Sequence, residues 1–233
     1  MKQMTGEIES PKSSYEIKND YAFATGRARA LEAKIMEPNL LEPAQVLKEY
    51  GLAGKDIDER LEELFEKDLM EFIDSAPEAV APFRLMADLT NMKAFVRMKL
   101  AKEKIPTSCL GSFAIPEDVD ELKMKLTDAG HPELADKLKG ILSMELNGID
   151  LELERYFVGK IENSLFRECL ELKKNYLNSE ETPLQFYAKL GRFVKEKLAI
   201  KNMDPDIPTA YLLLRQRELE LARAKAIKAL LGG

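Results

Sequence analysis

Apolar residues recur every three or four positions in one segment after another, and this spacing does most to limit how the chain can fold. Residues three and four positions apart share one face of an α-helix, so each such segment predicts an amphipathic helix. No useful window alternates apolar and polar residues with a period of two, and β-branched residues are sparse. The sequence therefore predicts an all-α protein. The clearest stripe contains Ile17, Tyr21, Ala24, Ala28, Leu31 and Ile35.

Prolines and glycines divide the stripes into separate helices, because proline suits the first turn of a helix and glycine suits its exit. Pro38, Pro77 and Pro116 each mark such a boundary. The short connections favour antiparallel neighbours, so we expect antiparallel helical bundles. The predicted helices cover residues 14–36, 40–50, 57–76, 82–104, 117–129, 132–148, 150–178, 182–201 and 211–231.

Residues 105–116 form the one sustained irregular segment and carry no charged side chain. We expect this loop to separate an N-terminal helical subdomain, residues 1–104, from a C-terminal helical subdomain, residues 117–233. A single continuous unit is the alternative. The loop contains apolar side chains that either fold back as a plug of the core or present a docking surface, namely Leu110, Phe113 and Ile115.

Charge gives two further indications. The formal net charge of −6 supplies no basic footprint of the kind that nucleic acid requires, so nucleic acid is not the expected partner. Residues 56–74 hold nine acidic and two basic side chains, whereas residues 92–104 hold five basic and one acidic. Two helices lying side by side would explain this asymmetry, and docking of a charged partner is the alternative.

A short basic pattern recurs beside the apolar stripes of three predicted helices. Chance pairs on solvated helices are the alternative to an internal repeat. If the repeat is real, its arginines should lie at related positions on neighbouring helices and form a basic surface for an acidic partner. The three copies are Arg27 with Arg29, Arg97 with Lys99, and Arg223 with Lys225.

Residues that commonly carry catalysis or bind metals are scarce. His131, the one histidine, lies between Gly130 and Pro132 and is predicted to be a surface turn residue. Cys109 and Cys169 form no CxxC motif, which fits a reducing compartment. No glycine-rich phosphate loop or Glu-x-x-His pair occurs, so we expect no catalytic residue, cofactor or metal. No apolar run approaches the ~20 residues that a membrane-spanning helix needs.

Several segments together resemble the C-subunit family of archaeal and bacterial V-type (A-type) ATPases, whose eukaryotic counterpart is the d-subunit of the V-ATPase. The most specific match runs from Tyr21 to Glu32, where the tyrosine precedes the run Arg27-Ala-Arg29-Ala. The matches follow the family's order from about residue 15 to the C-terminus. The other similar segments are residues 88–97, 110–117, 150–154, 183–187 and 218–225.

The resemblance implies a non-catalytic central-stalk protein that couples the rotary shaft to the membrane proteolipid ring, for proton or sodium transport or ATP synthesis. It implies shaft subunits and the ring as partners, no cofactor, and a cytoplasmic location peripheral to the membrane through the ATPase complex. Family members are longer and contain three similar helical subdomains, so this chain is expected to have one fewer. The expected partner-binding residues are Arg27, Arg29, Arg97, Lys99, Leu110, Phe113, Ile115, Arg223 and Lys225.

Two functions from other classes stay open. One is a helical adaptor or regulatory scaffold that belongs to no ATPase, and the genes neighbouring its own would distinguish it. The other is a helical enzyme whose site is built from dispersed carboxylates and arginines. Thermal shift with nucleotide, phosphate and divalent metals would reveal that enzyme.

Overall fold

The computed structural model describes residues 14–53, 56–100, 102, 107–200 and 206–231. Within these ranges the chain forms ten α-helices and one 3-10 helix and no strand, which confirms the all-α prediction. The side chains of residues 14–21, which include Ile17 and Tyr21 of the predicted stripe, lie outside the described part. The elements are α1 (Ser14–Glu32), η1 (Pro38–Leu40), α2 (Pro43–Glu49), α3 (Ile57–Met70), α4 (Pro77–Leu100), α5 (Val119–Asp128), α6 (Pro132–Leu142), α7 (Leu146–Gly159), α8 (Ser164–Leu177), α9 (Pro183–Ile200) and α10 (Asp206–Leu231).

Two predicted helices were too long. The expected helix over residues 150–178 is split into α7 and α8, because the side chain of Asn163 accepts a hydrogen bond from Phe166 N and caps a new helix. The expected helix over residues 132–148 ends at Leu142, and α7 begins after Glu145. The periodic stripe continues across both breaks, so the apolar pattern alone concealed them.

Two other helices begin earlier than predicted, and in both cases proline misled the prediction. α4 begins at Pro77, which leaves Pro82 inside the helix, and α10 begins at Asp206, which places Pro208 in its first turn. Pro208 costs little in the first turn of α10, because the N–H that it lacks has no helical partner there, whereas α4 continues past Pro82 with one backbone hydrogen bond fewer. The start of α3 matches the predicted one at residue 57: Asp56 accepts from the backbone N–H groups of Asp58 and Glu59 and so caps the helix.

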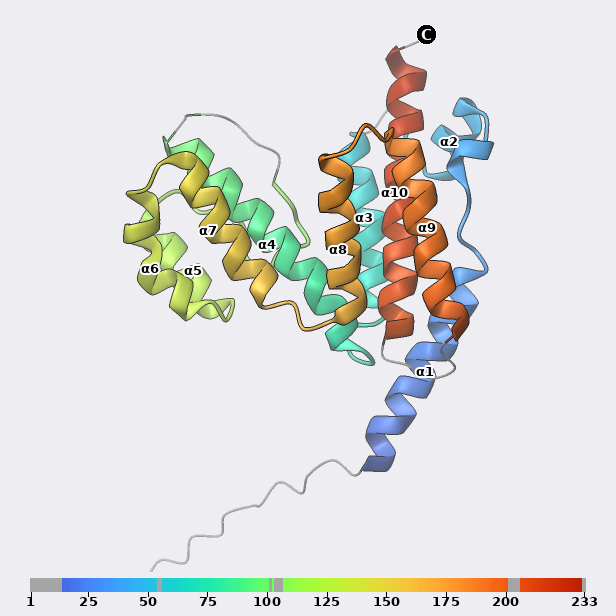
Figure 1. Ribbon diagram of the computed structural model, residues 1–233, viewed down its shortest axis with the longest axis horizontal. Coiled ribbons are helices and arrows are strands. Elements are labelled where there is room, and N and C mark those ends of the chain that lie inside the picture. Colours follow the sequence, from blue (N-terminus) through green and yellow to red (C-terminus); the bar gives the residue numbers. More distant parts are fainter. Residues whose placement is uncertain (1–13, 54–55, 101, 103–106, 201–205, 232–233) are drawn as a thin grey trace, which may run out of the picture.

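The helices form two lobes, which Figure 1 shows side by side. The larger lobe contains α1, α2, α3, α8, α9 and α10 together with the start of α4, and its core draws on residues 24–83 and 161–226. α10 lies at its centre and contacts α1, α2, α3, α8 and α9. The smaller lobe contains α5, α6, α7 and the rest of α4, and its core draws on residues 89–157.

α4 belongs to both lobes. Leu85 and Met86, about a third of the way along it, pack against both cores. The cores do not follow the expected boundaries at residues 104 and 117, since the larger core combines residues from both sides of them. The smaller lobe is thus inserted in sequence between two parts of the larger one.

Candidate functional site

The first arginine of each basic pair forms an ion pair with a carboxylate from another part of the chain. Arg27 on α1 donates from Nε and Nη2 to Glu71, at 3.1 and 2.8 Å. Arg223 on α10 donates from Nε and Nη2 to the two oxygens of Asp58, at 2.6 and 3.0 Å. Both acceptors belong to the acidic stretch over residues 56–74. This stretch therefore neutralises cations of α1 and α10.

The third copy pairs with a different helix. Arg97 on α4 donates from Nη2 to Asp150 on α7 at 2.9 Å, and Lys93 lies one turn away with its Nζ 2.5 Å from Glu154. The basic stretch over residues 92–104 thus pairs with α7 in these contacts. The expectation that it lies beside the acidic stretch was wrong: each stretch has its own partner helices.

The second basic residue of each copy also makes a shared kind of contact. Each of these three side chains donates a hydrogen bond to a main-chain carbonyl that is distant in sequence. The bonds run from Arg29 to Leu198 O at 2.7 Å, from Lys99 to Glu117 O, and from Lys225 to Asn39 O at 3.1 Å. In all three copies, therefore, the first basic residue binds a carboxylate and the second, two positions later, binds a carbonyl. Arg215 and Arg217 on α10 make the same two kinds of contact, with Asp68 and with the carbonyl of Tyr187.

The apolar residues of the loop face the protein's own cores. Phe113 is only 7% exposed within the smaller core, and Ile115 packs partly buried against that core. Leu110 packs partly buried against the core of the larger lobe. Of the two interpretations of this loop, the arrangement favours the plug.

Two buried side chains of α4 hold the loop in place. The amide of Asn91 donates from Nδ2 to the carbonyls of Ser108 and Phe113 at 2.9 and 3.0 Å and accepts from Ser108 N at 2.8 Å. Asp88 Oδ1 accepts from Ser112 N at 2.5 Å. Asn91 and Asp88 are 0% and 1% exposed, so their polar atoms need these partners.

His131 completes this buried cluster, and its position corrects the surface-turn prediction. It is 4% exposed, with Nε2 3.3 Å from Asp88 Oδ2 and Nδ1 3.5 Å from the hydroxyl of Tyr156. The imidazole ring also lies edge-on to Phe157, with ring centroids 5.0 Å apart. Gly130 before it takes a positive φ of 83°, which turns the chain inward. The polar atoms of Asp88, His131 and Tyr156 thus face one another across the smaller lobe's core.

A second buried polar cluster lies at the centre of the larger lobe. Glu218, which is 0% exposed, accepts from the hydroxyl of Tyr50 at 2.6 Å and pairs with Arg215 at 2.8 Å. Arg215 also donates to Asp68 at 2.7 Å, and Asp68 accepts from the hydroxyl of Tyr211 at 2.9 Å. Burial is the main cause that raises the pKa of both tyrosines. Sequence reasoning missed this cluster, because Glu218 lies among other charged residues of α10 and nothing local marks it as buried.

A cationic hollow of about 470 Å³ opens between α9 and the segment before η1. Arg217, Arg192 and Lys195 line it together with Glu37 and Glu196. Arg217 and Lys195 hold the pKa of Glu37 below its ordinary value, chiefly through the hydrogen bonds from Arg217. Glu37 is therefore already paired with Arg217, which is the buried cation of the hollow.

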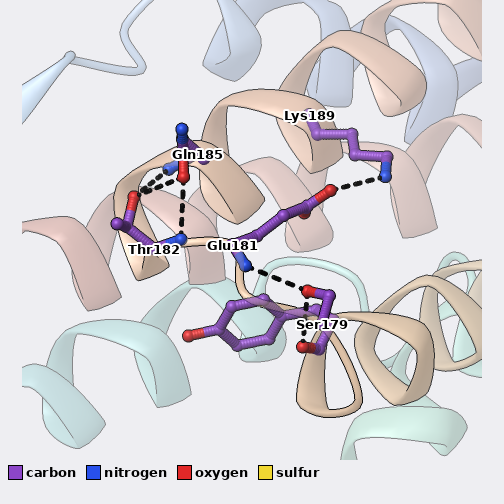
Figure 2. Close-up of polar contacts among 6 residues, drawn as sticks. Ser179, Glu181, Thr182, Gln185 and Lys189 are labelled. Carbon is purple, nitrogen blue, oxygen red and sulfur yellow. Dashed lines mark hydrogen bonds and ion pairs between the residues drawn. The ribbon is translucent and has the colours of Figure 1, made fainter.

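The turn between α8 and α9 exposes two leucines on a well-fixed backbone. Leu177 and Leu184 are 71% and 54% exposed on either side of it. Thr182 and Gln185 cap α9 reciprocally, because Thr182 N donates to Gln185 Oε1 at 2.8 Å and Gln185 N donates to Thr182 Oγ1 at 3.3 Å. Figure 2 shows this box with the neighbouring contacts of Ser179, Glu181 and Lys189.

Cys109 is exposed, and its thiol is a poor nucleophile, because partial burial and the nearby Glu62 carboxylate raise its pKa to about 11. Within the described ranges, no group of three or more histidine, cysteine or acidic residues is placed to hold a metal ion. None of the helices in the described part of the chain is both long and apolar enough to cross a membrane. Comparison with family models, curated proteins and solved structures finds no match to this chain.

Proposed function

We propose that this chain is a non-catalytic coupling component of a V-type ATPase or ATP synthase, which joins the rotary shaft to the membrane proteolipid ring. The observation that supports this proposal most is the contact pattern that recurs on α1, α4 and α10. These are the three longest of the described helices, and they carry three of the segments that resemble the family, including the most specific one. A protein built from repeated helical units would carry such a pattern.

The similar contacts that the three basic pairs make are stronger support than their similar spacing in the sequence. Two basic residues two positions apart are common on helices, but in each of these three copies the first binds a carboxylate and the second binds a distant carbonyl. Each pair thereby ties its helix to two other parts of the fold. Such contacts suit a protein that transmits torque, because they resist sliding of α1, α4 and α10 against their neighbours.

The same contacts define how these arginines would meet a shaft. The side chains of Arg27, Arg97 and Arg223 are 39%, 35% and 45% exposed, so each keeps a solvent-facing part while paired. Exposed charges steer association and add little affinity. Their contribution to shaft binding should therefore be kinetic and sensitive to salt.

The test measures association with immobilised shaft subunits of a V-type ATPase from the same organism. The wild-type chain should bind, and the variant with Arg27, Arg97 and Arg223 changed to Glu should bind more slowly at low salt, with a flatter salt dependence. The control changes Arg155, Arg167 and Arg192 to Glu, which alters the net charge equally away from the repeat. Equal association rates for both variants would remove these arginines from the interface.

Absence of any binding to shaft or ring by the folded wild-type chain would contradict the proposal as a whole. A helical adaptor that belongs to no ATPase would then be the better interpretation. In that case the neighbouring genes would not encode ATPase subunits. An enzyme would be indicated instead by a rise in melting temperature with Mg-ATP, phosphate or zinc. A ligand that binds only the native state stabilises it by about 2.7 kcal/mol at 100 times its dissociation constant.

A further inference from the structure

The loop over residues 107–116 lies between the two lobes and contacts both. On the larger-lobe side, the backbone N–H and the thiol of Cys109 each lie 3.3 Å from Glu62 Oε2 on α3. The neighbouring Leu110 packs against the larger core. The beginning of the loop is therefore attached to the larger lobe by two hydrogen bonds and an apolar contact.

The end of the loop is attached to the smaller lobe. Phe113 and Ile115 pack against the smaller core, and Asn91 of α4 binds the carbonyl of Phe113. Gly111 lies between the two attachments and directly against α4. A Cβ atom at this position would come within 2.7 Å of Asn91 Nδ2 and 2.8 Å of Asp88 Oδ1, so only glycine lets the loop approach this closely.

Within the described residues, the backbone also passes from one lobe to the other at two places. One is α4 itself, which contains Pro82 shortly before Leu85 and Met86, the residues shared by both cores. Proline inside a helix removes one backbone hydrogen bond. Pro82 lies between Val80 and Phe83 of the larger core, and the shared residues follow it. The other is the connection from α7 to α8 over residues 160–163. A contact between the lobes away from these two links would add resistance to a change of the angle between them.

We propose that residues 107–116 act as a strap that fixes the angle between the lobes, with Glu62 and Leu110 as its attachment to the larger lobe. The strap is fastened to α4 by Asp88 and Asn91 and is released by loss of the contacts to α3. This inference does not depend on the proposed function. It assigns the loop a mechanical role that burial of Phe113 alone would not require.

The test measures the distance between spin labels on the two lobes by pulsed electron resonance. Labels are attached to Cys introduced at Glu171 on α8 and at Lys137 on α6, both exposed, in a chain with Cys109→Ser and Cys169→Ala. Serine at position 109 retains a donor for Glu62. The strap variant combines Glu62→Ala with Leu110→Ser and leaves the bonds of Asp88 and Asn91 intact. Its distance distribution should shift and broaden relative to the parent chain.

Two controls keep the outcome specific. Glu59→Ala with Leu184→Ser makes the same chemical changes elsewhere on the larger lobe and should leave the distribution unchanged. Glu62→Gln retains an acceptor oxygen and should restore the narrow distribution when Leu110 is intact. Helix content by circular dichroism reports whether each variant is folded. A folded strap variant with the parent's distribution would overturn the proposal.

Discussion

Arg217 and Glu37 form a two-bond ion pair, in which Nη1 and Nη2 donate to the two carboxylate oxygens at 3.0 and 2.9 Å. The third donor of the guanidinium, Nε, binds the carbonyl of Tyr187 at 2.7 Å. A single side chain of α10 thereby joins α9 to the segment that links α1 with η1. Such bidentate pairs combine energy with a fixed geometry.

The first prediction concerns acid. Because the pKa of Glu37 is lower in the folded chain than its ordinary value of 4.5, the ion pair stabilises the fold fully above that value. This contribution is lost as the pH falls through the folded-state pKa. Glu37→Gln should therefore unfold at lower urea than wild type at pH 7, and the difference should shrink below pH 4.5. A constant difference at all pH values would show that charge on Glu37 is irrelevant.

The second prediction concerns the glycine under Arg217. A Cβ at Gly191 would lie 2.7 Å from Nε and 2.9 Å from Cζ of Arg217, whose guanidinium is held in place by its bonds to Glu37 and to the carbonyl of Tyr187. Gly191→Ala should therefore lower the unfolding free energy by about 1–3 kcal/mol, measured by urea unfolding. Gly140→Ala is the matched control, since nothing lies within 4 Å of its Cβ position in α6. It should raise stability by about 0.5–1 kcal/mol.

The third prediction separates the plug from the docking surface at Phe113. Truncating a buried phenylalanine costs about 3–5 kcal/mol, so Phe113→Ala should lower the melting temperature strongly. Leu184→Ala at a 54% exposed position should change the unfolding free energy by no more than about 0.5 kcal/mol. Retention of the wild-type melting temperature by Phe113→Ala would instead support docking.

The fourth prediction concerns alkaline pH. The unfolded Tyr50 ionises around 10, whereas burial and the bond to Glu218 hold its folded-state pKa higher. The folded chain therefore loses stability relative to the unfolded chain as the pH rises above 10. Tyr50→Phe should cost about 1–3 kcal/mol at pH 7, because Glu218 loses a partner in a buried site. The gap between wild type and Tyr50→Phe should narrow above pH 10 in urea unfolding.

The apolar spacing was enough to predict the helices, because period and burial are linked directly in an amphipathic helix. The acidic residue that precedes a stripe also marks a helix start, since the side chains of Asp56 and Asp118 both accept hydrogen bonds from the turn that follows. The break at Asn163 was missed because its stripe continues on both sides. Whether a helix breaks at a capping residue within a continuous apolar stripe depends on how the two resulting helices pack. The spacing of apolar residues does not contain that information.

At the candidate site too, local sequence patterns predicted some features, whereas contacts between distant residues were not predictable. The basic pairs were found in the sequence, and their placement on three long helices was expected. Their partners, such as Glu71 for Arg27 and Asp150 for Arg97, come from positions 44 and 53 residues away, and no local pattern specifies them. His131 was misplaced for the same reason, because the buried carboxylate that it meets, Asp88, is 43 residues earlier.

The insertion of the smaller lobe within the larger one sets an order on synthesis. A chain leaving the ribosome presents all residues of the smaller core, 89–157, before α8, α9 and α10 exist. The smaller lobe can therefore fold first, because domains generally fold as units and its whole core is available earlier than that of the larger lobe. The apolar faces of α2 and α3 must meanwhile wait for α10, which is made after them and lies at the centre of their core. During that interval they are the surfaces that a chaperone would cover.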